Sequence, residues 1–240
     1  MSAGSEPNDA AHPEASDRLT RLNARIVQRL RQGPYGKRVL IGLRRDLSVP
    51  FPAPVPKIPI KLRALRPEDL PTLFPPRDGV AAEREHADVT WRLRMVEQGS
   101  LRSRCFVAVD DTAGRPCHIQ WLTMGYSDAI RAAAALPALS LDEALLENAY
   151  TPNLYRGMGI MSAVTARIAD YAASSGLRYV VALVDQRNVA SLRGGQQAGL
   201  APWRITTQRQ FGFGLFRWGR FAPTPASLPM PPESAIDATG

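Results

Sequence analysis

Residues 145–164 read LLENAYTPNLYRGMGIMSAV, and residues 179–200 read YVVALVDQRNVASLRGGQQAGL. In the first stretch an apolar segment over 144–151 runs into a glycine-containing turn, and a helix is predicted over 157–175 with Gly176 at its end. The second stretch predicts a buried strand over 179–184 and a helix over 188–198. A strand, a helix and a strand in this order predict a parallel β-α-β crossover.

The flanking sequence predicts antiparallel strands on both sides of that unit. A hairpin is expected around the turn at 110–114, with register that places Cys105 nearer Gln120 than Cys117, so no disulfide is expected. The other expected strands cover 61–65, 203–209 and 211–218, and helices are expected from Pro67 and over 80–98 and 126–138. Together these elements predict an α+β fold: a mixed, mostly antiparallel central sheet flanked by helices.

The two ends of the chain differ in composition from its middle. We expect residues 1–16 and 222–240 to be disordered tails, because the first are small, polar and acidic and the second are rich in proline. Residues 17–46 are expected to form a basic amphipathic arm, helical over 17–32, and 47–59 a proline-rich linker. The folded domain is then expected over residues 60–221.

The chain has a net charge of +8 and a pI near 10.1. The excess of basic over acidic residues is densest in that arm. Residues 17–46 hold nine basic and two acidic side chains. An anionic partner for the arm, either a membrane surface or a nucleic acid, is one interpretation. The alternative, which we favour, is that the arm packs on its own domain or on a partner subunit, and a homodimer stays open.

Several classes of protein are disfavoured by composition. The 240 residues include two cysteines and three histidines without metal-binding spacing, so no metal site is expected. No apolar run is long enough to span a membrane, and the first thirty residues are too charged for a signal peptide, so we expect a cytoplasmic protein.

The turn Arg156-Gly157-Met158-Gly159 has the chemistry of a pyrophosphate site. Glycines permit close approach of the backbone, and the first N–H groups of the following helix carry partial positive charge. No GxxxxGK[ST] motif occurs, which excludes a Walker loop. A dinucleotide fingerprint is approximated by Gly157, Gly159 and Ser162, with Asp185 as the ribose acid, but too little chain follows for a doubly wound sheet.

Residues 60–218 resemble the GNAT superfamily of acyl-CoA-dependent N-acyltransferases. The resemblance rests on the two stretches quoted above: Arg156-Gly157-Met158-Gly159 is similar to the family's pyrophosphate loop, Asn188 and Ser191 to its Asn-x-x-Ser helix, and Gly199-Leu200 to its Gly-Phe. KLRALRPEDL is similar to the family's first strand and helix. The family transfers acyl groups, most often acetyl, from CoA to amines.

The resemblance implies where acetyl-CoA binds. Strand 144–151 is expected to splay from its neighbouring strand. Backbone groups of Tyr150 and Thr151 would bind the pantetheine arm, and the amides of residues 157–160 (Gly157, Met158, Gly159 and Ile160) would bind the pyrophosphate beside Arg156.

A carboxylate is the expected proton acceptor for the attacking amine. Glu143 and Glu147 lie on one face of the predicted strand, and Glu147 is the first choice because it is nearer the expected thioester. The alternative is that Glu147 binds an arginine or backbone. The sequence departs from the family at two positions, Leu154 and Gly195. Many members have, at the position of Gly195, a tyrosine that protonates the thiolate. In this chain water, Tyr150 or Tyr155 would supply that proton instead.

The expected function is therefore transfer of an acetyl group from acetyl-CoA to a small-molecule or peptide amine. Two alternatives stay open. One is an inactive acyl-CoA-binding module, favoured by the missing tyrosine. The other is an acyltransferase whose amine is attached to nucleic acid, as in aminoacyl-tRNA, favoured by the basic arm.

Overall fold

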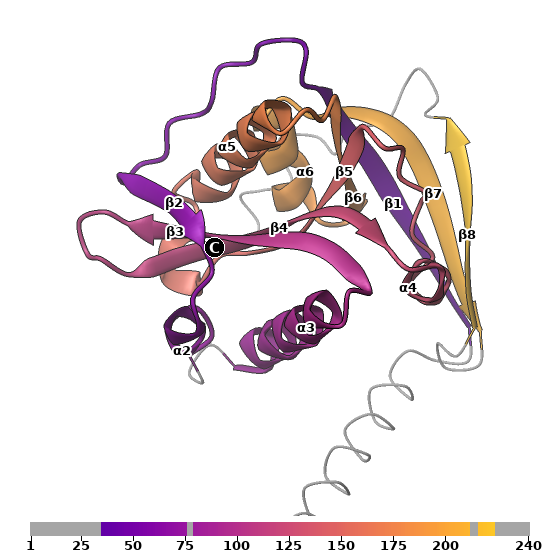
Figure 1. Ribbon diagram of the computed structural model, residues 1–240, viewed down its shortest axis with the longest axis horizontal. Coiled ribbons are helices and arrows are strands. Elements are labelled where there is room, and N and C mark those ends of the chain that lie inside the picture. The colour runs from indigo at the N-terminus through magenta and orange to yellow at the C-terminus, as the bar shows by residue number, and fades with distance from the viewer. Residues whose placement is uncertain (1–34, 76–78, 212–215, 224–240) are drawn as a thin grey trace, which may run out of the picture.

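The computed structural model describes residues 35–75, 79–211 and 216–223 (Figure 1). Its strands are β1 (Tyr35–Asp46), β2 (Ile60–Ala64), β3 (Leu101–Asp110), β4 (Pro116–Tyr126), β5 (Glu143–Tyr150), β6 (Tyr179–Asp185), β7 (Ala201–Phe211) and β8 (Phe216–Pro223). Its helices are α2 (Leu70–Leu73), α3 (Gly79–Glu97), α4 (Asp128–Ala134), α5 (Ile160–Ser174) and α6 (Val189–Gln197), with 3₁₀ turns at Pro67–Asp69 and Asn153–Tyr155. No helix among these residues is both long and apolar enough to cross a membrane.

The strands form one sheet in the order β2-β3-β4-β5-β6-β1-β7-β8. Among its pairs only β5 and β6 are parallel, and α5 connects them. The predicted α+β fold, with a mostly antiparallel sheet and one β-α-β crossover, is confirmed. The hairpin is also as expected, since Cys105 lies opposite Trp121 and Phe106 opposite Gln120. Both cysteines are free and buried.

The N-terminal boundary of the domain differs from the prediction. Residues 35–46, expected to belong to a basic arm, are strand β1, which pairs with both β6 and β7. The charged residues of this strand are concentrated toward its two ends, while Leu40, Ile41 and Leu43 are buried. Two neighbouring strands satisfy its backbone groups, and that gain outweighs the local charge. The expected helix over 17–32 and most of the expected tails lie outside the described residues.

Residues 47–59 do not separate two parts of the molecule. They run from β1 to β2 across the end of α5 (Figure 1). The Lys57 amide donates to the Met158 carbonyl at 2.9 Å. Phe51 packs so closely on Gly199 that a Cβ there would lie 2.7 Å from its ring. The expected linker is therefore a segment of the domain packed beside the glycine turn.

Helices cover both faces of the sheet. α5 and α6 lie on one face and α2 and α3 on the other (Figure 1). The larger core lies under α5 and includes Leu146, Ile160, Val164, Ile168 and Val180. The smaller core lies under α2 and α3 and includes Leu73, Val89, Val107, Trp121 and Tyr150. β5 contributes to both, because a register shift in its pairing with β4, between Glu147 and Tyr150, places Tyr150 on the opposite face from Leu146.

Candidate functional site

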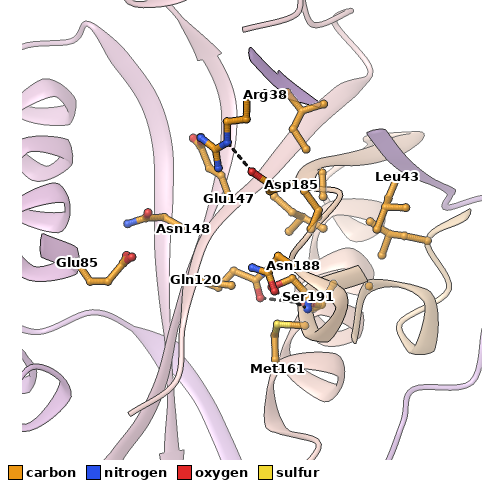
Figure 2. Close-up of a pocket in the computed structure, with 18 residues that line it drawn as sticks. Arg38, Leu43, Glu85, Gln120, Glu147, Asn148, Met161, Asp185, Asn188 and Ser191 are labelled. Carbon is orange, nitrogen blue, oxygen red and sulfur yellow. Dashed lines mark hydrogen bonds and ion pairs between the residues drawn. The ribbon is translucent and has the colours of Figure 1, made fainter. Parts of the chain in front are cut away.

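A pocket of about 300 Å³ opens where the pairing of β5 and β6 ends. The ladder between these parallel strands covers residues 143–146 and 179–182, although β5 continues to Tyr150 and β6 to Asp185. Residues from both strands beyond the ladder line the pocket, together with residues of α3, α5 and α6 (Figure 2). The pocket therefore reaches from the α5 face of the sheet toward α3. The expected splaying of strand 144–151 itself stays a prediction.

Polar side chains form the α5 side of this pocket. The Thr165 hydroxyl of α5 donates to Gln120 Oε1 of β4 at 3.1 Å, and both residues line the pocket. Next to Gln120 on the same face of β4, His118 Nδ1 lies 2.7 Å from the Thr151 hydroxyl. Burial lowers the pKa of His118 to about 4, so the ring is neutral near pH 7. Of these side chains Thr165 and Gln120 reach the pocket, and their neutral hydrogen-bonding groups suit a polar uncharged ligand segment.

The glycine turn before α5 has the backbone geometry expected for it. Gly157 and Gly159 have φ values of 73° and 72°, which only glycine adopts without strain. An added Cβ at Gly157 would meet nothing within 4 Å, whereas at Gly159 it would lie 3.7 Å from Pro56. α5 begins at Ile160, and Met161 in its first turn lines the pocket. The free N–H groups of the helix start thus lie next to the pocket.

Arg156 adds a charge to this turn. Its guanidinium is exposed, and Nε donates to the Thr151 carbonyl at 3.1 Å. That bond connects the glycine turn to the end of β5. An arginine beside helix N–H groups is a combination suited to a phosphate or pyrophosphate.

Asn188 and Ser191 lie at the start of α6, and both line the pocket. Asn188 Oδ1 accepts a hydrogen bond from the Ser191 amide at 3.1 Å, so this asparagine caps α6. The helix continues through Gly194 and Gly195. An added Cβ would overlap Met161 Cε at Gly194 and would lie 2.7 Å from Leu43 Cδ1 at Gly195, so the pair permits close packing of α6 on α5 and β1.

Glu147 lines the pocket, and its carboxylate is fully engaged on the α3 side of β5. Arg92 Nη1 and Nη2 of α3 donate to its two oxygens at 2.7 and 3.1 Å. The Thr123 hydroxyl of β4 also donates to Oε1. This is the arrangement that the sequence left as the alternative for Glu147, a carboxylate bound to an arginine.

Glu143 lies at the other end of β5 and is not among the pocket's lining residues. Its Oε2 accepts a hydrogen bond from the Ser140 amide at 3.2 Å, and its Oε1 is 3.9 Å from Arg44 Nε. The shared strand face predicted for Glu143 and Glu147 does not bring both to the pocket, because three residues of β5 separate them along the strand.

The two tyrosines considered as proton donors also lie away from the pocket lining. Tyr150 is buried on the α3 side, where its ring centroid is 5.0 Å from that of Phe74. The Tyr155 hydroxyl donates to Asp110 Oδ2 at 3.4 Å, next to the hairpin. Burial raises the pKa of Tyr155 above its usual value.

Four polar pocket residues were not candidates on sequence: Arg38, Glu85, Asn148 and Thr165. Glu85 lies on the sheet-facing side of α3, at helical spacing from buried Ala82 and Val89. A charged residue within such an apolar stripe is the signal that could have identified it. Asn148 gave no signal in sequence, because its φ of 52° is a property of the folded β5.

Ion pairs occupy one end of the pocket. Arg38 Nε donates to Asp185 Oδ2 at 2.8 Å (Figure 2). The Arg187 amide donates to Asp185 Oδ1 at 3.0 Å. Burial opposes ionisation of Asp185, but the bonds from Arg187 and Arg38 together keep the pKa of Asp185 well below its usual range. Within the described part of the chain, no three histidine, cysteine or acidic side chains gather as a metal site.

Comparison with known proteins gives structural neighbours only. No protein-family model matches the sequence. No curated protein matches it either. A tandem GNAT protein from the clavulanic acid biosynthesis pathway superposes with a TM-score of 0.50 at 12% identity, covering 92% of this chain and 74% of that one. A GNAT-family acetyltransferase from Colwellia psychrerythraea gives a TM-score of 0.48 at 15% identity, covering 80% and 74%.

Other neighbours are longer than this chain. A GCN5-related N-acetyltransferase from Sphaerobacter thermophilus gives a TM-score of 0.45 at 18% identity, with 78% of this chain and 56% of that one covered. The chain spans 56% of the length of this structure, and 59% and 23% of the length of two further structural neighbours. The mixed sheet, the β5-α5-β6 crossover and the superposition on the tandem GNAT protein agree: the chain has the fold of the GNAT N-acetyltransferases.

Proposed function

We propose that the protein transfers an acyl group, acetyl in the first instance, from acyl-CoA to an amine. The observation that carries the proposal is the junction of the glycine turn with the pocket: α5 starts at Ile160, and Met161 in its first turn already lines the opening beside β5. If the anionic group of a ligand binds at the glycine turn, the rest of the ligand can extend into the pocket.

The residues fit such a substrate. Gly157 leaves open space where a side chain would stand, and Arg156 and the helix N–H groups offer positive charge for a pyrophosphate. Backbone groups near Tyr150 and Thr151 are the proposed partners of the pantetheine arm, and Asn148 and Ala149 join them because they line the pocket. Asn188 and Ser191 face the same space from α6.

In the proposed reaction a neutral amine nitrogen attacks the thioester carbonyl carbon. The C–N bond forms, the C–S bond breaks with its electron pair on sulfur, and the amine loses a proton. Glu147 is the proton acceptor predicted from sequence, but both of its carboxylate oxygens accept hydrogen bonds from Arg92. The amine, the acyl length, a cytoplasmic location and a homodimer remain predictions.

The test is release of thiol from acetyl-CoA with spermidine, glucosamine, a lysine peptide and an alanine-terminated peptide. Gly157→Ala should weaken acetyl-CoA binding at least tenfold. Gly114→Ala is its matched control, because Gly114 has a φ of 67° and equally open surroundings but lies in the hairpin turn. Binding without thiol release on any amine would instead favour an acyl-CoA-binding module.

A further inference from the structure

Three carboxylates line the pocket, and their surroundings differ. Glu147 is bound by Arg92, and Asp185 is bound by Arg38 and Arg187. Glu85 of α3 has no hydrogen bond or ion pair with any residue in the described part of the chain. It is half-buried rather than at the surface. A carboxylate turned into a pocket without a partner is costly unless a ligand or proton compensates it.

The same part of the pocket holds a second unmatched polar group. Asn148 Nδ2 is buried and has no partner among the described residues. In Figure 2 the Glu85 carboxylate and the Asn148 amide point toward one another across the space between α3 and β5. An acceptor and a donor, both unsatisfied and facing one space, indicate that a polar group of a substrate fits between them.

We propose that Glu85, and not Glu147, accepts the proton of the attacking amine; this assignment rests on the proposed function. Glu85 approaches the pocket from the α3 side, opposite the glycine turn and α5. An amine substrate that enters from the α3 side would reach Glu85 before it reaches the thioester. A protonated primary amine is the acceptor chemistry that fits an unpaired carboxylate.

The proton balance is simple. The ammonium group of the acceptor gives one proton to the Glu85 carboxylate and becomes a nucleophile. The C–N bond forms and the C–S bond breaks, and the leaving thiolate takes, through water, the proton that the new amide nitrogen loses. Glu85 then returns its proton to solvent, so no other reactant is needed.

The electrostatic surroundings agree with that role. Burial, and after it the charge of Asp88, raise the pKa of Glu85 above its usual value, and Arg84 and Arg92 partly oppose this. The raised pKa makes Glu85 a better base. The other charged groups that face this space are Glu147, which Arg92 neutralises, and the Arg38–Asp185 pair.

Glu85→Gln is the decisive variant, with Glu83→Gln as matched control because Glu83 is exposed on the same helix and does not line the pocket. Removing an unpaired charge should leave the thermal midpoint unchanged or higher. For whichever amine of the panel wild type acetylates, kcat/KM should fall about 100-fold in Glu85→Gln and less than twofold in Glu83→Gln. The dissociation constant for acetyl-CoA should change less than twofold, and the acidic limb of the kcat/KM profile should flatten.

The outcomes separate the two claims. If Glu85→Gln and Glu83→Gln both keep kcat/KM within twofold of wild type with the same pH profile, the assignment of Glu85 is wrong and the proposed function stands. If wild type neither binds acetyl-CoA nor releases thiol, the proposed function is wrong and the assignment fails with it.

Discussion

Arg92 of α3 binds both carboxylate oxygens of Glu147 of β5, at 2.7 and 3.1 Å, across the two layers of the fold. The side chains are 13% and 16% exposed, so this pair is largely withdrawn from water. Asp88 contacts Arg92 from one helical turn away at 3.2 Å. The pair therefore fixes α3, and Glu85 with it, relative to the end of β5.

The Arg92–Glu147 pair gives a prediction for stability. Glu147→Gln leaves Arg92 with too little compensating charge and should lower the free energy of unfolding by about 3 kcal/mol, measured in urea. Replacing both partners by methionine should recover most of that loss, because no buried charge is then left unpaired. An unchanged unfolding midpoint for Glu147→Gln would mean that the ion pair is not maintained in solution.

Asn148 gives a prediction that separates stability from activity. Its φ of 52° suits glycine better than asparagine. Asn148→Gly should therefore raise the free energy of unfolding, by up to about 1 kcal/mol. The same variant removes an amide that lines the pocket, so kcat/KM should fall. A lower thermal midpoint for Asn148→Gly would contradict the backbone conformation described for β5.

His118 gives a prediction for pH dependence. Its pKa falls from 6.5 to about 4 on burial, so the unfolded chain takes up a proton below pH 6.5 that the folded protein does not. Above pH 6.5 the protonation of His118 favours neither the folded nor the unfolded state. Between pH 6.5 and pH 4 it lowers the free energy of unfolding by up to about 1.4 kcal/mol for each unit by which the pH falls. His118→Gln should flatten that part of the stability curve in urea titrations, and an unchanged slope would show that the ring is not buried neutral.

The glycine pair of α6 gives a prediction for packing. Gly195→Ala should destabilise the protein by about 1–3 kcal/mol despite the better helix propensity of alanine, because its Cβ meets Leu43 at 2.7 Å. Gly194→Ala should cost less, since the atom it meets is the flexible end of Met161. Thermal melts of the two variants test this order. If both variants had a thermal midpoint equal to or higher than that of the wild type, close packing would not be the reason for the two glycines.

Strand β1 gives a prediction for truncation. A chain that starts at Tyr35 keeps every strand of the sheet, whereas a chain that starts at Leu47 lacks the strand between β6 and β7. The shorter chain should lose cooperative unfolding, and the longer one should keep it together with its affinity for acetyl-CoA. Cooperative unfolding of the chain that starts at Leu47 would show that β1 is dispensable.

The crossover and the glycine turn could be predicted because their signals are local: apolar runs, a helical stripe and glycines at fixed spacing. β1 could not, because its partners lie about 140 and 165 residues away and its ends are charged. Propensity and charge act on neighbours in sequence, while a strand is stabilised by the two strands beside it. For the same reason the sequence predicts a linker over residues 47–59, although these residues pack on the domain.

The site was only partly predictable. Arg156, Gly157 and Gly159 stand in a contiguous motif, and the structure brings their turn next to the pocket. Glu85 reaches the pocket through the packing of α3 on the sheet, a tertiary contact that no local pattern encodes. Glu147 was visible in sequence, but its partner Arg92, 55 residues earlier, was not.

The central claim is that the glycine turn and the opening beside β5 form one acyl-CoA site. Isothermal titration of acetyl-CoA into the full chain tests it most directly, with the Gly157→Ala and Gly114→Ala variants measured alongside. We predict one molecule bound per chain, with affinity reduced at least tenfold in Gly157→Ala and unchanged in Gly114→Ala. No binding of acetyl-CoA to wild type at millimolar concentration, or equal affinity in all three proteins, would contradict the claim.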